Sequence, residues 1–112
     1  MTIAINTRFL LKDKLEGMGR FTYEVVRRMV EQHPEHEFLF LFDRPYDPSF
    51  VFADNVKPII LFPPARHPIL WVYWFEMSVV AALKKYKPNV FLCPSNFLSI
   101  KTNVPTVLVV HD

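Results

Sequence analysis

Both glycines of the chain, Gly17 and Gly19, lie within three residues of each other and directly before an amphipathic run. A helix that begins there would present unpaired backbone N–H groups and a partial positive charge, and the glycines would let a ligand approach the backbone closely. Arg20 adds a guanidinium that can hold a phosphate through two hydrogen bonds. The segment Gly17-Met18-Gly19-Arg20 therefore predicts a diphosphate-binding turn. A loop glycine followed by a helix-capping glycine, with Arg20 in solvent, explains the same residues without a ligand.

This turn differs from two well-known phosphate-binding motifs. The dinucleotide fingerprint has a third glycine where this chain has Thr22, and it follows its strand directly. Here about ten residues separate the first apolar run from Gly17. The nucleoside triphosphate-binding loop needs Gly-Lys-Ser or Gly-Lys-Thr, which the sequence lacks.

His111 and Asp112 follow directly on a β-branched apolar run. In open α/β sheets, ligands bind outside the carboxyl ends of the strands, so titratable side chains there are well placed for catalysis. A histidine can share a hydrogen bond with a substrate hydroxyl, and a neighbouring aspartate can fix the ring tautomer or a turn. We therefore name His111 and Asp112 as candidate catalytic residues, beside the alternative of a structural histidine.

Two further sets of titratable residues have simpler explanations. His33 and His36 flank Pro34, which would end the helix that could align them, and no third ligand is evident, so the pattern does not favour a metal site. Asp43 and Asp47 follow an apolar run, but the acidic cluster of a phosphoacceptor domain is missing. Both are expected to form turns beside nearby prolines.

Ten prolines divide the chain into apolar runs with two different periods. Residues 20–32 predict an amphipathic helix, and residues 68–86 predict a second helix that ends in lysines. Short apolar runs predict buried strands, namely 2–8, 37–43, 57–62, 89–93 and 106–111. The order β, α, β, β, α, β, β predicts a doubly wound α/β fold with a mainly parallel sheet and helices on both faces.

The composition is that of one globular domain. The chain has 112 residues, of which 51% are hydrophobic and 21% charged, and this excludes disordered and coiled-coil proteins. Thirteen basic and eleven acidic residues give a net charge of +2, too small to predict nucleic-acid binding. The single Cys93 predicts a buried thiol in a reducing compartment. The first residues lack the features of a signal peptide, which predicts a cytoplasmic location.

The predicted helix 68–86 is apolar on nearly all sides in its first half. Glu76 and the short apolar run argue against a transmembrane span, which needs about 20 apolar residues. We expect this helix to be buried against the sheet. The alternative is contact with a partner or a membrane surface through Trp71, Trp74 and Phe75.

Five short motifs occur in a fixed order along the chain: Ile5-Asn6-Thr7-Arg8, Gly17-Met18-Gly19-Arg20-Phe21-Thr22, His33-Pro34-Glu35-His36-Glu37-Phe38, Leu70-Trp71 and Val110-His111-Asp112. Together they resemble the N-terminal domain of the family 4 glycosyltransferases, which are retaining enzymes of the GT-B type. The resemblance runs along the whole chain. The ordered set is much more specific than any one of its members.

The resemblance implies two Rossmann-like domains that face each other across a cleft, the first chiefly holding the acceptor and the second a nucleotide-sugar donor. Residues 1–112 would be part of the first domain, and the donor-binding domain would lie outside them. Gly17, Gly19 and Arg20 would lie beside the donor diphosphate, and His111, followed by Asp112, would contact the donor sugar. The reaction implied is transfer of a glycosyl group to an acceptor hydroxyl with retention of configuration.

The resemblance also implies that no cofactor or bound metal is needed, because helix dipoles and basic side chains stabilise the departing nucleoside diphosphate. The expected partners are the nucleotide sugar and a glycan or lipid-linked acceptor, as in surface or cell-envelope glycan synthesis, with peripheral association at the inner face of the membrane. No shared motif identifies the acceptor-binding residues. The alternative function is a stand-alone α/β ligand-binding or protein-interaction module without catalysis.

The predicted strand 106–111 would lack the helix that a right-handed crossover supplies next. An apolar strand without cover promotes association. We therefore expect residues 1–112 alone to form dimers or larger oligomers, through a sheet edge or the helix 68–86, and to be catalytically inactive.

Overall fold

The computed structural model describes residues 1–7, 10, 18–43, 45–61, 74–93 and 104–108. Its strands are β1 (Thr2–Asn6), β2 (Glu37–Phe42), β3 (Val56–Ile60), β4 (Val90–Cys93) and β5 (Thr106–Leu108). Its helical elements are α1 (Met18–Gln32), the short 3-10 helix η1 (Pro48–Phe50), the π-helix η2 (Trp74–Val79) and α3 (Val80–Tyr86). Every strand and helix predicted from the sequence has a counterpart at the expected place.

All five strands pair in parallel, in the order β3-β2-β1-β4-β5. The central strand is β1, in which Ile3 lies opposite Phe38 of β2 and Val90 of β4. The chain builds the sheet outward from β1 to β3, then crosses to the other side of β1 and continues outward through β4 to β5. This strand order is that of a Rossmann-like, doubly wound α/β fold, so the predicted fold class is confirmed.

Strand β2 shows why the sheet has a core on each face. All of its residues except the first are buried. Because successive side chains of a strand point to opposite faces, Phe38, Phe40 and Phe42 join one apolar cluster, while Leu39 and Leu41 join another. A continuous apolar run is therefore the pattern that a strand covered on both sides requires.

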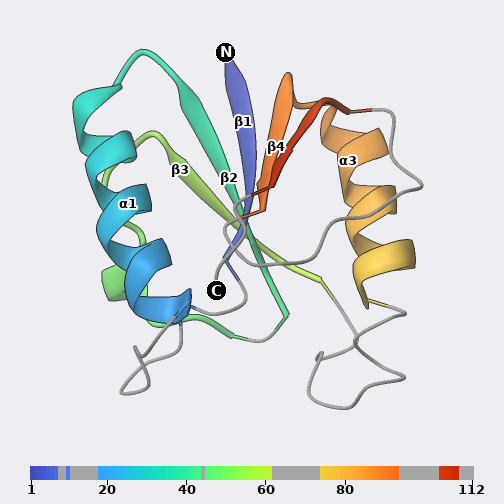
Figure 1. Cartoon of the computed structure of the whole chain (residues 1–112), viewed down its shortest axis with the longest axis horizontal. Helices are drawn as coiled ribbons and strands as arrows, with labels where there is room; N and C mark the ends of the chain where they lie inside the picture. The colour runs from blue at the N-terminus through green and yellow to red at the C-terminus, as the bar shows by residue number, and fades with distance from the viewer. Residues whose placement is uncertain (8–9, 11–17, 44, 62–73, 94–103, 109–112) are drawn as a thin grey trace.

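The two faces of the sheet are covered by different helices (Figure 1). On one face, α1 contributes Val26 and Val30, and η1 contributes Phe50. On the opposite face, the cluster contains Trp74 of η2 and Leu83 of α3. Layers of helix on both sides of one parallel sheet confirm the predicted arrangement.

Helix α3 ends as the sequence predicts. Lys87 adopts the left-handed conformation, with φ of 49°, and its N–H donates to the carbonyl oxygen of Leu83 over 3.0 Å. Lys84 and Lys85 place positive charge in the last turn, where it interacts favourably with the helix dipole. Pro88 then prevents the helix from continuing.

Two predicted elements extend beyond the described residues. The second helix is described from Trp74 onward, where its first described part is the π-helix η2, and residues 68–73 lie outside the described part of the chain. Strand β5 is described over three residues, and residues 109–111 of the predicted strand lie outside the description. Within the described ranges, no helix is both long enough and apolar enough to cross a membrane.

Self-association through β5 is expected from its place in the sheet. It is an edge strand among the described strands, and Val107 is 51% exposed. We expect Val107→Lys to weaken self-association by about tenfold or more, because a charge on an edge strand opposes pairing with a second sheet. Sedimentation over a concentration series measures this change.

Met77→Lys is the matched control, because Met77 is also 51% exposed but belongs to the helical element η2 and not to the edge strand. Dissociation by Met77→Lys and not by Val107→Lys would place the contact on the helical face. A wild-type chain that remains monomeric at high micromolar concentration would contradict self-association through β5 and through the helical face alike.

Candidate functional site

Four buried polar residues gather where the first two strands end. Asn6 is the last residue of β1, Thr7 follows it, Asp43 follows β2, and Thr22 lies near the start of α1. Their exposed fractions are 0–2%, and they are the buried polar or charged residues of the part of the chain that the structure describes. Since parallel strands end at the same edge of a sheet, the site lies at the carboxyl edge.

Thr7 fixes the backbone at this edge. Its N–H and its hydroxyl both donate to the carbonyl oxygen of Leu41, over 3.1 and 3.0 Å. The carbonyl oxygen of Thr7 in turn accepts from the N–H of Leu10 over 2.9 Å, and the Leu10 side chain is buried in the core under α1. Thr7 is therefore tied to β2 directly and to the core through Leu10.

Helix α1 begins near the carboxyl edge, with its blue N-terminal end at the bottom of Figure 1 and the start of β1 at the top. Gly19 lies in the first turn of α1 and is buried, whereas Arg20 is exposed. The structure thus brings these two predicted residues to the carboxyl edge. Gly17, His111 and Asp112, the other predicted site residues, lie outside the described residues.

The buried polar side chains were not among the residues predicted for the site. The sequence pattern places Asn6 and Thr7 in the first predicted strand and Asp43 in a turn. The sequence does contain a pattern that points to Asn6, Thr7 and Asp43. Each of them stands at the end of a predicted parallel strand, where ligands bind in open α/β sheets. Thr22 carried no such signal, since its position near the helix start resembles an ordinary surface threonine.

Gly19 has a steric role that the structure makes testable. Because the residue is buried, a β-branched side chain there would be forced against its neighbours. We expect Gly19→Val to lower the free energy of unfolding by about 1–3 kcal/mol. Urea denaturation measures the change, and Arg20→Val, at the adjacent exposed position, should stay within about 0.5 kcal/mol of the wild type. Equal effects of the two substitutions would contradict the close packing of Gly19.

A second cluster lies at the opposite, amino edge of the sheet, in the turn between α1 and β2. The ring nitrogen Nδ1 of His33 lies 3.4 Å from Oε2 of Glu35, and Nε2 of His36 lies 3.9 Å from the same oxygen. The two imidazole rings stack with centroids 5.6 Å apart. The expectation that no third ligand lies near the two histidines was wrong, because Glu35 reaches both of them.

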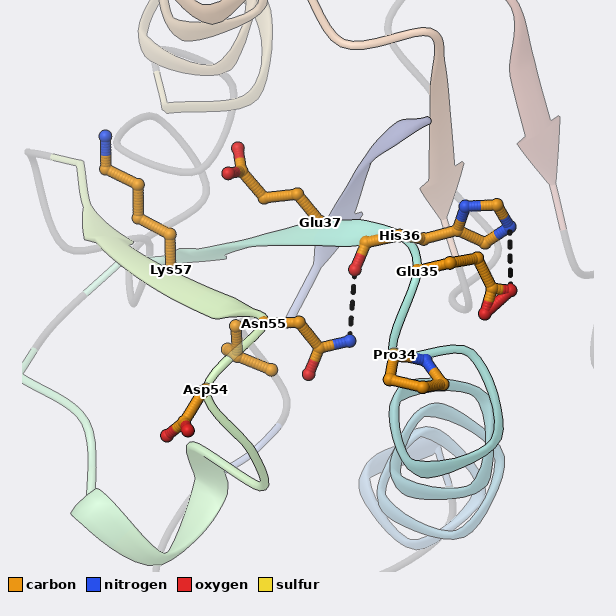
Figure 2. A pocket seen from close by; sticks show the side chains of 8 residues that line it. Pro34, Glu35, His36, Glu37, Asp54, Asn55 and Lys57 are labelled. Carbon is orange, nitrogen blue, oxygen red and sulfur yellow. Dashed lines mark hydrogen bonds and ion pairs between the residues drawn. The ribbon is translucent and has the colours of Figure 1, made fainter.

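Asn55, which directly precedes β3, holds this turn in place. Its Nδ2 donates to the carbonyl oxygens of Val30, His33 and His36, over 3.4, 3.2 and 3.1 Å. Figure 2 shows the Asn55 amide directed at the His36 carbonyl and the Glu35 carboxylate facing the His36 ring. A pocket of about 240 Å³ adjoins the turn, between the starts of β2 and β3.

The two edges of the sheet therefore offer different chemistry. The carboxyl edge places buried hydroxyl, amide and carboxylate groups beside a helix N-terminus, which favours an anionic group. The amino edge places two imidazoles around one carboxylate. The chain matches no protein-family profile, no curated protein and no solved structure.

Proposed function

We propose that this chain forms the acceptor-side domain of a retaining glycosyltransferase of the GT-B type. The enzyme would move a sugar from a nucleotide-sugar donor to an acceptor hydroxyl in the synthesis of a surface or cell-envelope glycan. The observation that carries the proposal is the group of buried polar side chains at the carboxyl edge, beside the start of α1. A Rossmann-like sheet binds ligands at that edge.

In this proposal the start of α1 faces the donor diphosphate. The buried Gly19 keeps the first turn free of a side chain, and the exposed Arg20 can reach a phosphate oxygen. Gly17, which directly precedes α1 in the sequence, would also lie beside the diphosphate. His111 and Asp112, three and four residues after the described end of β5, would meet the donor sugar near the reacting carbon.

The residues have distinct roles in the proposed reaction. Departure of the nucleoside diphosphate leaves negative charge on its phosphate oxygens, and the helix N-terminus and Arg20 stabilise that charge without a bound metal. His111 orients the donor sugar through a hydrogen bond. A second, donor-binding domain would supply the remaining contacts, so we expect no turnover by residues 1–112 alone.

A titration with nucleoside diphosphates and nucleotide sugars, followed by the backbone amide signals in NMR spectra, tests the proposed site. We expect weak binding, with signals moving at Asn6, Gly19, Thr22 and Asp43 and remaining still at His36. Arg20→Ala should weaken the response. Arg28→Ala, on the same helix, is the matched control, because Arg28 is exposed and paired with Glu24 instead.

Signals that move only at the amino edge, or a response that Arg20→Ala leaves unchanged, would contradict the proposed diphosphate position. Binding at the carboxyl edge with no transfer activity when a donor-binding domain is present would favour the alternative of a ligand-binding module. A protein-interaction role would need the aromatic side chains of Trp71, Trp74 and Phe75 to be accessible to a partner. This role is less favoured, because Trp74 is fully buried.

A further inference from the structure

The turn between α1 and β2 gathers three metal-ligating side chains from four consecutive residues. Nitrogen atoms of His33 and His36 and a carboxylate oxygen of Glu35 all lie within 4.8 Å of one another. Ligands bound to one zinc ion at about 2.0–2.2 Å are separated by roughly 3–3.5 Å. The His33 to Glu35 distance of 3.4 Å already meets this separation, and the His36 to Glu35 distance of 3.9 Å is close to it.

The backbone of the turn holds the three residues in this arrangement. The N–H of His36 donates to the carbonyl oxygen of His33 over 3.1 Å, which closes a turn with Pro34 at its second position. The Asn55 amide donates to the carbonyl oxygens of both histidines from outside the turn. A ligand therefore meets a preformed backbone and only has to draw the side chains together.

The side chains themselves remain available to an ion. His33 and Glu35 are half-exposed or more, and the His36 side chain is 29% exposed. Among the described residues, Nδ1 of His36 has no hydrogen-bond partner, so no hydrogen bond fixes the proton on either ring nitrogen. Nε2, which faces Glu35, can supply its lone pair without breaking an existing bond.

The local charge favours a cation. The adjoining pocket is lined by two further carboxylates, Glu37 and Asp54, and by one ammonium group, that of Lys57. Figure 2 shows Lys57 directed away from Glu35 and His36, so its charge does not neutralise the cluster.

We propose that His33, Glu35 and His36 bind one divalent transition-metal ion of the zinc type. Two imidazoles and one carboxylate suit Zn²⁺ and Co²⁺ better than Mg²⁺ or Ca²⁺, which prefer ligand sets made of oxygen. Water completes the coordination, because the turn supplies only three ligands. The ion joins the end of α1 to the start of β2, and Asn55 acts as a positioning residue.

This site is separate from the proposed donor site. Strand β2 runs from the amino edge to the carboxyl edge, and its six residues span about 20 Å. The metal-binding turn and the carboxyl-edge cluster therefore lie at opposite ends of the strand. Failure of either proposal leaves the other unaffected.

Calorimetric titration of the untagged, metal-free chain with Zn²⁺ tests the proposal. We expect one ion per chain, bound in the micromolar range. His33→Gln and His36→Gln should each weaken binding by about a hundredfold, and Glu35→Gln and Asn55→Ala by about tenfold. The matched controls are His67→Gln, a histidine outside the turn, and Glu31→Gln, an exposed glutamate paired with Arg27, and both should stay within twofold of the wild type.

Two further measurements separate metal binding from loss of folding. Zn²⁺ should raise the melting temperature of the wild type and of His67→Gln, but not that of His36→Gln, since an ion stabilises only a native state that binds it. Co²⁺ should give a visible absorption spectrum that disappears in His33→Gln. The proposal is overturned by the absence of saturable binding below about 1 mM, or by equal loss in His67→Gln and His36→Gln.

Discussion

Replacing Trp74 by alanine is expected to lower the free energy of unfolding by about 3–5 kcal/mol. The indole is fully buried in the cluster that includes Leu39, Leu83 and Phe91, and its removal leaves a cavity that the surrounding strands cannot close. The substitution also removes the bond from Nε1 to the carbonyl oxygen of Leu61, which is 3.0 Å long. A domain of this size is stabilised by roughly 6–17 kcal/mol, so the loss is a large part of the total.

Urea denaturation followed by circular dichroism measures this loss, since the far-ultraviolet signal does not depend on the indole. Met77→Ala is the matched control within η2, because Met77 is 51% exposed and its truncation should change the stability by less than about 0.5 kcal/mol. The loss in the free energy of unfolding for Trp74→Phe should lie between those of Met77→Ala and Trp74→Ala, since phenylalanine keeps most of the apolar volume and loses the hydrogen bond. A change below 1 kcal/mol for Trp74→Ala would show that η2 does not pack against the sheet.

Alkaline pH is expected to destabilise the chain through Cys93. Burial raises the pKa of this thiol from its ordinary value of 9.0 to about 12. Between these two values the unfolded state has lost the proton while the native state retains it, so stability falls as the pH rises. The contribution is fully present below pH 9 and is lost by pH 12, and it amounts to about 4 kcal/mol.

Chemical denaturation between pH 8 and pH 11 tests this prediction when the wild type is compared with Cys93→Ala. The variant lacks the thiol, so its stability should fall less steeply, and the difference between the two curves isolates Cys93 from other groups that titrate in this range. The native thiol should also resist alkylation at pH 8, because the thiolate is the reactive form. Parallel curves for the two proteins would contradict the buried position of Cys93.

The layers of this fold could be predicted from the sequence because strand burial and helix burial leave different periods. Residues 38–42 are apolar without interruption, as a strand covered on both faces must be, and α1 shows the three-to-four-residue period of a helix covered on one face. The π-helix η2 could not be predicted in the same way. A π-helix shifts the helical register locally. Because the segment is rich in aromatic residues, its apolar pattern does not show which register the helix adopts.

The cluster at the amino edge was missed for a definite physical reason. Helix geometry does not bring His33 and His36 together, because Pro34 excludes a helix. A hydrogen-bonded turn, however, also brings its first and fourth residues together, and proline is favoured at its second position. The contribution of Asn55 depends on the register between β2 and β3, which no local pattern encodes.

The strand order β3-β2-β1-β4-β5 also determines which core can form first during synthesis of the chain. The cluster under α1 consists of buried residues between Ile3 and Val56, so it can form early in synthesis. The opposite face has to wait for Leu83 and Phe91, and the N–H of Thr2 bonds to Asn89, 87 positions along the chain. Such distant contacts form slowly. A chain that pauses between residues 60 and 83 therefore has all the buried residues of one core but lacks Val90 and Leu92, which pack against it, and its other face exposes apolar strands that a chaperone or a second chain can bind.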